Sequence, residues 1–71
     1  VEIYSIPNCP YCVKAKNLAM NKGHEVIYNM MGEEFQATDV KTLFPTARTF
    51  PQIIVDGEKI GGYVELEKMI G

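Results

Sequence analysis

The chain has 71 residues, of which 46% are hydrophobic and 23% charged, a composition typical of one small globular domain rather than of a disordered segment. Its formal net charge of -2 argues against partners among nucleic acids and membrane surfaces. No apolar run has the length of a membrane span and no signal peptide is recognisable, so we expect a single cytoplasmic domain over residues 1–71.

The N-terminal part of the chain predicts a strand followed by a helix. Apolar residues alternate with polar ones over residues 1–6, as in a half-buried strand. A helix over residues 10–22 follows, because Asn8 or Cys9 can act as its N-cap and Pro10 fits its first turn.

The middle of the chain predicts a second strand and a short helix. Residues 24–29 contain a run of high β-propensity. Residues 31–36 are expected to form a loop. Thr38 is expected to cap a helix over residues 38–44, which has an apolar face and ends before Pro45.

The C-terminal part predicts a hairpin and a helix. Residues 52–56 are expected to form a strand buried on both faces. Asp56-Gly57 is a strong hairpin signal and leads into a short fourth strand, and a last helix covers residues 63–70.

The predicted element order is β-α-β-α-β-β-α. The first β-α-β unit should form a right-handed parallel crossover, and the hairpin should be antiparallel. We therefore expect an α/β fold with a four-stranded mixed sheet flanked by three helices.

The two cysteines, Cys9 and Cys12, are too close in sequence for their disulfide to act as a structural staple. Metal binding and redox chemistry are the remaining explanations. A zinc site needs four ligands, and His24 is the only histidine that the chain adds to the two thiols. We therefore favour redox chemistry and expect no metal site within one chain.

A Cys-x-x-Cys motif between a first strand and a helix is typical of thiol–disulfide chemistry. A thiolate at Cys9 faces the free N–H groups at the helix N-terminus, which lower the pKa of a thiol from ~8.5 into the range ~3.5–7.5. Cys12, one turn further on the buried side, should stay protonated. Cys9 is therefore expected to attack a disulfide and Cys12 to resolve the intermediate, while Pro10 restricts the loop and Tyr11 points outward.

Cys9-Pro10-Tyr11-Cys12 matches the active-site signature of dithiol glutaredoxins. Thr49-Phe50-Pro51-Gln52 is similar to that family's Thr-Val-Pro-Gln segment, in which the proline is cis, and Gly61-Gly62 resembles its double glycine before the last helix. The resemblance implies a thioredoxin-like fold and a thiol–disulfide oxidoreductase. Such an enzyme reduces protein disulfides and glutathione mixed disulfides, with glutathione as reducing co-substrate and no bound cofactor.

The resemblance also implies a glutathione site beside the cysteines. The backbone of Phe50 would pair with the cysteinyl part of glutathione, the N-terminus of the last helix would bind its γ-glutamyl carboxylate, and Arg48 would bind its glycyl carboxylate. The expected glutathione-binding residues are Arg48, Thr49, Phe50, Pro51, Gly62, Tyr63, Val64 and Glu65. The chain departs from the family at Ile6, where Lys is common, and at Val64, where Asp, Thr or Ser is common.

Three functions stay open from the sequence. The first is a monomeric glutaredoxin acting on glutathione and on disulfide-bonded or glutathionylated proteins, with ribonucleotide reductase as one candidate. The second is a glutaredoxin-shaped thioredoxin, which a flavoprotein reductase reduces and which donates electrons to ribonucleotide reductase. The third is a binding module in which two chains share zinc or an iron–sulfur cluster through Cys9, although Pro10 disfavours the cluster.

Overall fold

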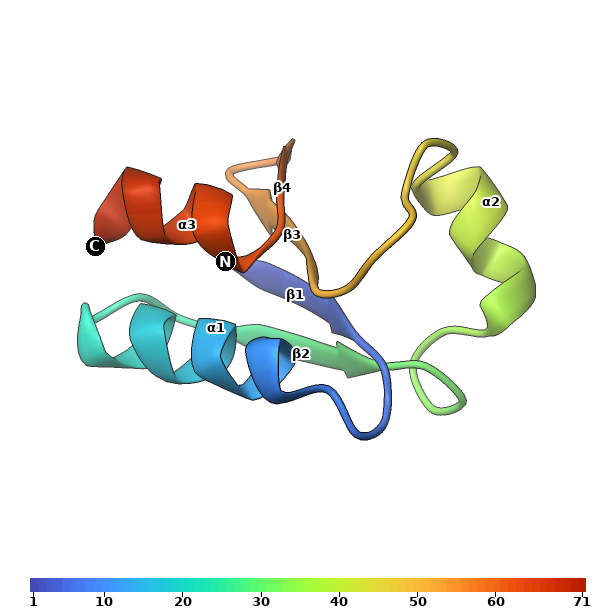
Figure 1. Cartoon of the computed structure of the whole chain (residues 1–71), viewed down its shortest axis with the longest axis horizontal. Coiled ribbons are helices and arrows are strands. Elements are labelled where there is room, and N and C mark those ends of the chain that lie inside the picture. The colour runs from blue at the N-terminus through green and yellow to red at the C-terminus, as the bar shows by residue number, and fades with distance from the viewer.

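In the computed structural model, which describes residues 1–71, the elements follow the predicted β-α-β-α-β-β-α order (Figure 1). A 3-10 turn, η1, precedes the second helix. The elements are β1 (Glu2–Ser5), α1 (Pro10–Asn21), β2 (Ile27–Met30), η1 (Ala37–Asp39), α2 (Val40–Leu43), β3 (Gln52–Val55), β4 (Glu58–Gly61) and α3 (Tyr63–Ile70). None of the helices has the length and apolar character that crossing a lipid bilayer requires.

The four strands form one mixed sheet in the order β2-β1-β3-β4. β1 pairs in parallel with β2, where Ile3 lies opposite Tyr28, and antiparallel with β3, where Ile3 lies opposite Ile53. β3 and β4 form the antiparallel hairpin. Its turn residues Asp56 and Gly57 both have positive φ, 51° and 81°, as the Asp-Gly pair predicts.

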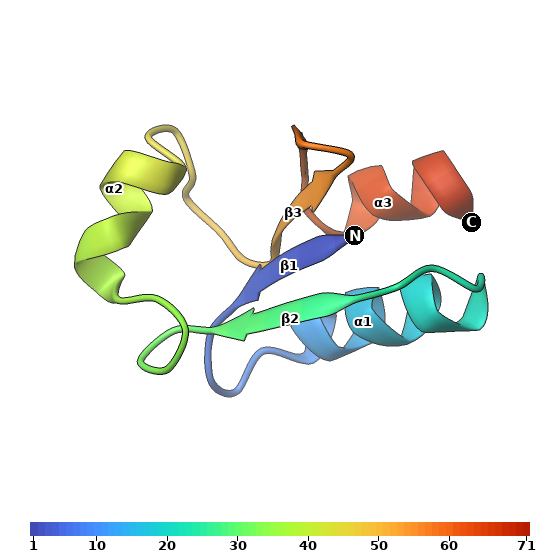
Figure 2. The same cartoon turned by 180° about the vertical axis from the view of Figure 1, so that it is seen from behind.

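The main core lies between one face of the sheet and two helices. α1 and α3 lie side by side on this face in both opposed views (Figures 1 and 2). Apolar side chains from the two central strands and both helices are completely buried there. They are Ile3, Ala15, Ala19, Ile53 and Leu66. This packing fixes the first turns of α1 and α3 relative to each other, and those two turns carry the candidate site.

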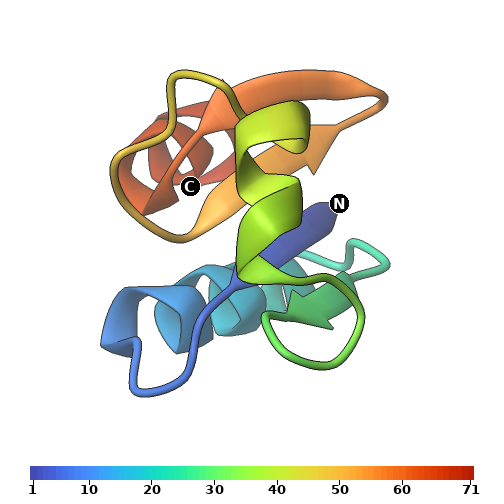
Figure 3. The same ribbon diagram turned by 90° about the vertical axis from the view of Figure 1, so that its right-hand side faces the viewer.

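The opposite face of the sheet has a smaller aromatic cluster. The ring of Tyr4 packs edge-on against Phe35 and Phe44, with centroid distances of 5.1 and 5.0 Å. Phe35 is only 5% exposed, although the sequence predicts only a loop there. Its burial follows from contact with Tyr4, which is distant in sequence. α2 lies at this end of the molecule, in front of the sheet in Figure 3.

The prediction of a helix capped by Thr38 is wrong in its boundaries. Thr38 lies inside the 3-10 turn, and α2 covers only Val40–Leu43. The N-cap position belongs to Gln36, whose backbone N–H donates a hydrogen bond to the Asp39 carboxylate across 2.8 Å. Because this hydrogen bond caps the 3-10 turn at Gln36, the turn begins at Ala37 and not after Thr38.

Two strand predictions also need correction. The second strand begins at Ile27 rather than at residue 24. β3 is not buried on both faces, since Ile53 is fully buried whereas Ile54 and Val55 are partly exposed. The cause is that the two larger helices cover only one face of the sheet, so an uninterrupted apolar run does not guarantee burial on both.

Candidate active site

Of the two N-cap candidates that the sequence offers, Asn8 and Cys9, the structure places Cys9 at the N-cap of α1. Its backbone is extended, with φ -115° and ψ 98°, and the helix begins at Pro10. The backbone N–H of Cys12 donates a hydrogen bond to the Sγ of Cys9 across 3.2 Å. One of the unpaired N–H groups of the first turn is therefore aimed at this sulfur.

Cys9 and Cys12 are joined by a disulfide, with their Cα atoms 5.3 Å apart. Cys12 is fully buried against the core, whereas Cys9 is partly exposed. A nucleophile arriving from solvent therefore reaches the Cys9 sulfur and not the Cys12 sulfur. This asymmetry fits the expected roles, in which Cys9 exchanges with substrate and Cys12 resolves.

The segment before β3 lies against the cysteine pair. The Phe50–Pro51 peptide bond is cis, as the resemblance implied. The carbonyl oxygen of Phe50 lies 3.9 Å from the Sγ of Cys9. The side-chain amide of Gln52 donates a hydrogen bond to the carbonyl of Thr49 across 2.6 Å, which holds this loop closed on itself.

A groove of about 300 Å³ extends from this segment to the start of α3. Its lining combines an aromatic residue of the Cys-x-x-Cys loop with two segments from the C-terminal half. The lining residues are Tyr11, Thr49, Phe50, Pro51, Gly62, Tyr63, Val64 and Glu65. Seven of the eight expected glutathione-binding residues thus surround one hollow. Arg48 is exposed and is not among the lining residues, so its role stays a prediction.

The side chain of Glu65 takes part in this groove in a way that sequence reasoning missed. The backbone N–H of Gly62 donates to its carboxylate across 2.8 Å. The carboxylate also lies so close to Gly61 that a Cβ there would be 2.6 Å from Oε1. The signal was present in the sequence, because a glutamate at the third helix position commonly bonds the N-cap N–H.

Two tyrosines flank the same groove. The rings of Tyr11 and Tyr63 are 5.8 Å apart between centroids. The hydroxyl of Tyr63 donates a hydrogen bond to the carboxylate of Glu67 across 3.2 Å. This hydrogen bond, together with some desolvation and the charges of Glu67 and Tyr11, raises the pKa of Tyr63 above its ordinary value.

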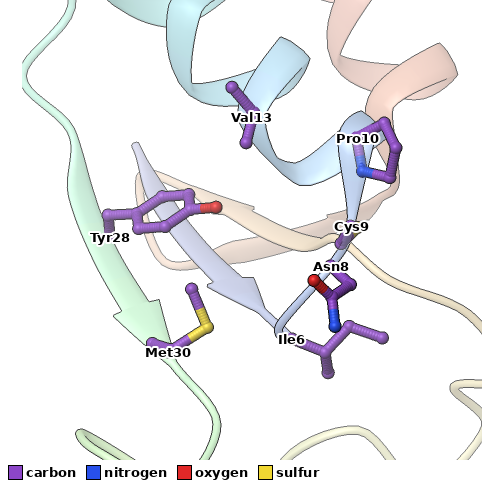
Figure 4. Close-up of a pocket in the computed structure, with 7 residues that line it drawn as sticks. All are labelled: Ile6, Asn8, Cys9, Pro10, Val13, Tyr28 and Met30. Carbon is purple, nitrogen blue, oxygen red and sulfur yellow. The ribbon is translucent and has the colours of Figure 1, made fainter.

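A second hollow of about 450 Å³ opens on another side of Cys9 (Figure 4). It lies between the β1–α1 loop, the first turn of α1 and strand β2. Its lining residues are Ile6, Asn8, Cys9, Pro10, Val13, Tyr28 and Met30. No sequence motif predicts this hollow, because Tyr28 and Met30 reach it only through the pairing of β2 with β1.

The structure contains no group of three or more His, Cys, Asp or Glu side chains placed to hold a metal ion. The cysteine pair itself combines two sulfurs, a helix N-terminus and two adjoining hollows. Such an arrangement can form and break a disulfide without unfolding the domain, because the two Cα atoms are already at a distance suited to a disulfide.

Residues 1–60 match the family model described as Glutaredoxin. The chain is 34% identical to a glutaredoxin of Haemophilus influenzae, an alignment that covers 99% of this chain and 88% of that protein. It is also 34% identical to the hybrid peroxiredoxin hyPrx5 of the same organism, over 96% of this chain but only 28% of that protein.

The fold has a matching structural relative. The crystal structure of glutaredoxin 1 from Francisella tularensis, complexed with cacodylate, superposes with a TM-score of 0.75 and 26% sequence identity. The match covers 94% of this chain and 86% of that one. The family match, the structural match, the Cys9–Cys12 pair and the strand order of the sheet all point to the same family. The chain belongs to the glutaredoxin family of thiol–disulfide oxidoreductases and has the thioredoxin-like fold.

Proposed function

We propose that the protein is a glutathione-dependent oxidoreductase that reduces protein disulfides and glutathione mixed disulfides through Cys9 and Cys12. The observation that carries the proposal is the position of the Cys9 sulfur. It accepts a hydrogen bond from the Cys12 N–H and lies 3.9 Å from the carbonyl of Phe50, which lines the groove. A ligand seated in the groove would thus meet the exchanging sulfur.

Reduction of a substrate disulfide takes two exchange steps. The Cys9 thiolate attacks one substrate sulfur, forms a Cys9–substrate disulfide and expels the other sulfur as a thiolate, which takes a proton from water. Cys12 then loses its proton to solvent, attacks the Cys9 sulfur and releases the second substrate thiolate, which also takes a proton from water. The substrate gains two electrons and two protons, and the protein is left with the Cys9–Cys12 disulfide.

Glutathione would restore the dithiol in two further steps. A glutathione thiolate attacks the Cys9 sulfur, because the Cys12 sulfur is buried, and this frees Cys12. A second glutathione thiolate then attacks the sulfur of the bound glutathione. The products are glutathione disulfide and the Cys9 thiolate, so each catalytic cycle consumes two molecules of glutathione.

The groove offers complementary groups for the γ-glutamyl end of glutathione, which carries both a carboxylate and an ammonium group. The N–H groups of Val64 and Glu65 lie in the first turn of α3 and have no acceptor within the helix, so they suit a carboxylate. The side-chain carboxylate of Glu65 suits the ammonium group. The N-terminus of α3 would thus bind both the carboxylate and the ammonium group of the γ-glutamyl end.

One observation favours the second candidate, a thioredoxin-like protein reduced by a flavoprotein reductase. Neither hollow beside Cys9 includes a lysine or arginine among its lining residues. The glycyl carboxylate of glutathione therefore has no cationic side chain in the groove, since Arg48 lies outside the lining. We keep the glutathione proposal because the groove residues match those that the family resemblance implies.

The deciding experiment compares two reducing systems on the same oxidised protein. One contains NADPH, glutathione reductase and glutathione, and the other NADPH and thioredoxin reductase. Free thiols on Cys9 and Cys12 are counted by alkylation and mass spectrometry. We expect rapid reduction by the glutathione system. Reduction by thioredoxin reductase alone would replace the proposal with the second candidate.

A charge-removing variant tests the groove. Glu65→Gln keeps an acceptor for the Gly62 N–H but removes the carboxylate, so we expect the KM for glutathione to rise roughly two- to fivefold, as for an exposed ion pair. Glu58→Gln removes the same charge from β4, where the residue is exposed and lines neither hollow. Equal KM values for the two variants would contradict the assigned role of Glu65.

A further inference from the structure

The sulfur of Cys9 lies close to two hollows of different character. On one side, the carbonyl of Phe50 connects it to the groove that contains Glu65 and the N-terminus of α3. On the other side, Cys9 itself lines the second hollow (Figure 4). A group bonded to Cys9 would therefore have both surfaces within reach.

The second hollow is lined mainly by apolar groups and bears no ionised side chain. Ile6, Val13 and Met30 contribute aliphatic or thioether surface, and Tyr28 contributes its ring. Figure 4 shows Val13, Tyr28 and Met30 on one side of the hollow, and Ile6, Asn8 and Pro10 on the other. Val13 is 51% exposed, so this apolar surface is open to solvent. It is a site for an apolar group and not for a carboxylate or ammonium.

The covalent intermediate makes a polypeptide the natural occupant. When a protein disulfide is reduced, the substrate cysteine is bonded to Cys9, and the chain leaves that cysteine in two directions. If one arm lies in the groove, the other passes the mouth of the second hollow. A second glutathione molecule is a poor alternative there, because none of the lining residues carries a charge. The ammonium group of Lys16 lies over the ring of Tyr28, 5.0 Å from its centroid, and could serve at most one of the two carboxylates of glutathione.

We propose that the second hollow binds an apolar side chain adjacent to the reacting cysteine of a protein disulfide substrate. The inference rests on the proposed function, since it names the substrate class of the same cysteine pair. It follows that the protein selects, among disulfide-bonded polypeptides, those with leucine-like residues beside the cysteine. The volume of about 450 Å³ accommodates such a side chain.

The test uses disulfide-linked peptide dimers of sequence Gly-X-Cys-X-Gly, with X either Leu or Ser. The dimer is symmetric, so attack on either sulfur gives the same intermediate. The protein is reduced beforehand and freed of reductant, and a single turnover is followed by chromatography without glutathione. We expect the Leu dimer to react about tenfold faster than the Ser dimer, the low end of the discrimination that an apolar pocket provides.

A pair of variants on α1 tests whether the preference for the Leu dimer arises in the second hollow. Val13→Asn replaces an apolar lining residue by an amide and should reduce the Leu-to-Ser rate ratio to below about threefold. Met20→Asn makes a similar change on the same helix at a residue that is 55% exposed and lines no hollow. It should leave the ratio unchanged. Both positions are exposed, so neither substitution removes core packing.

The outcomes separate this inference from the proposed function. Reduction of glutathione disulfide by the same pre-reduced protein reports the thiol exchange chemistry by itself. If that reaction proceeds and the wild type reduces both dimers equally, the inference is overturned while the oxidoreductase function stands. An equal fall of the ratio in both variants would likewise overturn it. If the protein reduces none of the disulfides, both proposals fail.

Discussion

The backbone N–H of Cys12 points at the Sγ of Cys9 across 3.2 Å. The residue that resolves the intermediate thus also supplies a hydrogen bond to the sulfur that attacks. In the reduced protein the same N–H and the positive end of α1 would stabilise a Cys9 thiolate. A thiolate at Cys12 is not stabilised in this way, because its sulfur is buried against the core.

This geometry predicts selective alkylation. In the reduced protein at pH 7, iodoacetamide should modify Cys9 at least about ten times faster than Cys12, since the thiolate is the nucleophile and Cys12 is fully buried. Peptide mass spectrometry over a time course measures both rates. Initial modification of Cys12 would show that the assignment of the two roles is reversed.

Of the two adjacent glycines Gly61 and Gly62, we expect substitution of Gly61 to lower the stability of the protein more. Its φ is 114°, and a Cβ would lie 2.6 Å from the Glu65 carboxylate, so Gly61→Ala should lower the free energy of unfolding by about 1–3 kcal/mol. Gly62 has an ordinary φ of -109°, and its nearest neighbour would be 3.3 Å away, so Gly62→Ala should cost less. Urea unfolding of both variants checks the order, and a larger loss at Gly62 would contradict it.

The hydrogen bond between Tyr63 and Glu67 predicts a late phenol titration. The bond favours the neutral phenol, so the pKa of Tyr63 lies above its ordinary value near 10. Its contribution to stability is complete below pH 10 and is lost as the pH rises through the raised pKa. Absorbance of the phenolate, followed against pH, should show that Tyr63 titrates above the ordinary range of a tyrosine.

Glu67→Ala removes both the acceptor and its charge, and should return the pKa of Tyr63 toward the ordinary value. Tyr63→Phe identifies the signal by removing it. A titration curve that is the same in the wild type and in Glu67→Ala would show that the hydrogen bond does not control the ionisation of Tyr63.

The sequence allowed prediction of features that depend on near neighbours. The start of the first helix at Pro10, with Asn8 or Cys9 as its cap, follows from the proline, and the hairpin turn follows from Asp56-Gly57. The expected glutathione-binding residues have a different origin, because Thr49-Phe50-Pro51 and Gly61-Gly62 resemble family motifs, and the structure brings most of that set around one groove. Seven predicted residues surround it.

The features that escaped prediction depend on contacts between distant segments. Phe35 is buried because the ring of Tyr4, which is distant in sequence, packs against it, and nothing beside Phe35 in the sequence indicates this. The second hollow needs β2 to place Tyr28 and Met30 beside the first turn of α1. The family resemblance implies a role for the backbone N–H of Glu65 but none for its carboxylate, which accepts a hydrogen bond from the Gly62 N–H.

The most direct test of the central claim is a mixed-disulfide assay on the wild type, Cys9→Ser and Cys12→Ser. The substrates are a glutathionylated peptide and a peptide disulfide, with glutathione as reductant. Cys9→Ser should be inactive on both, whereas Cys12→Ser should still remove glutathione but lose the reduction of the peptide disulfide. Equal loss of both reactions in the two variants would contradict the division of roles between an exposed attacking sulfur and a buried resolving one.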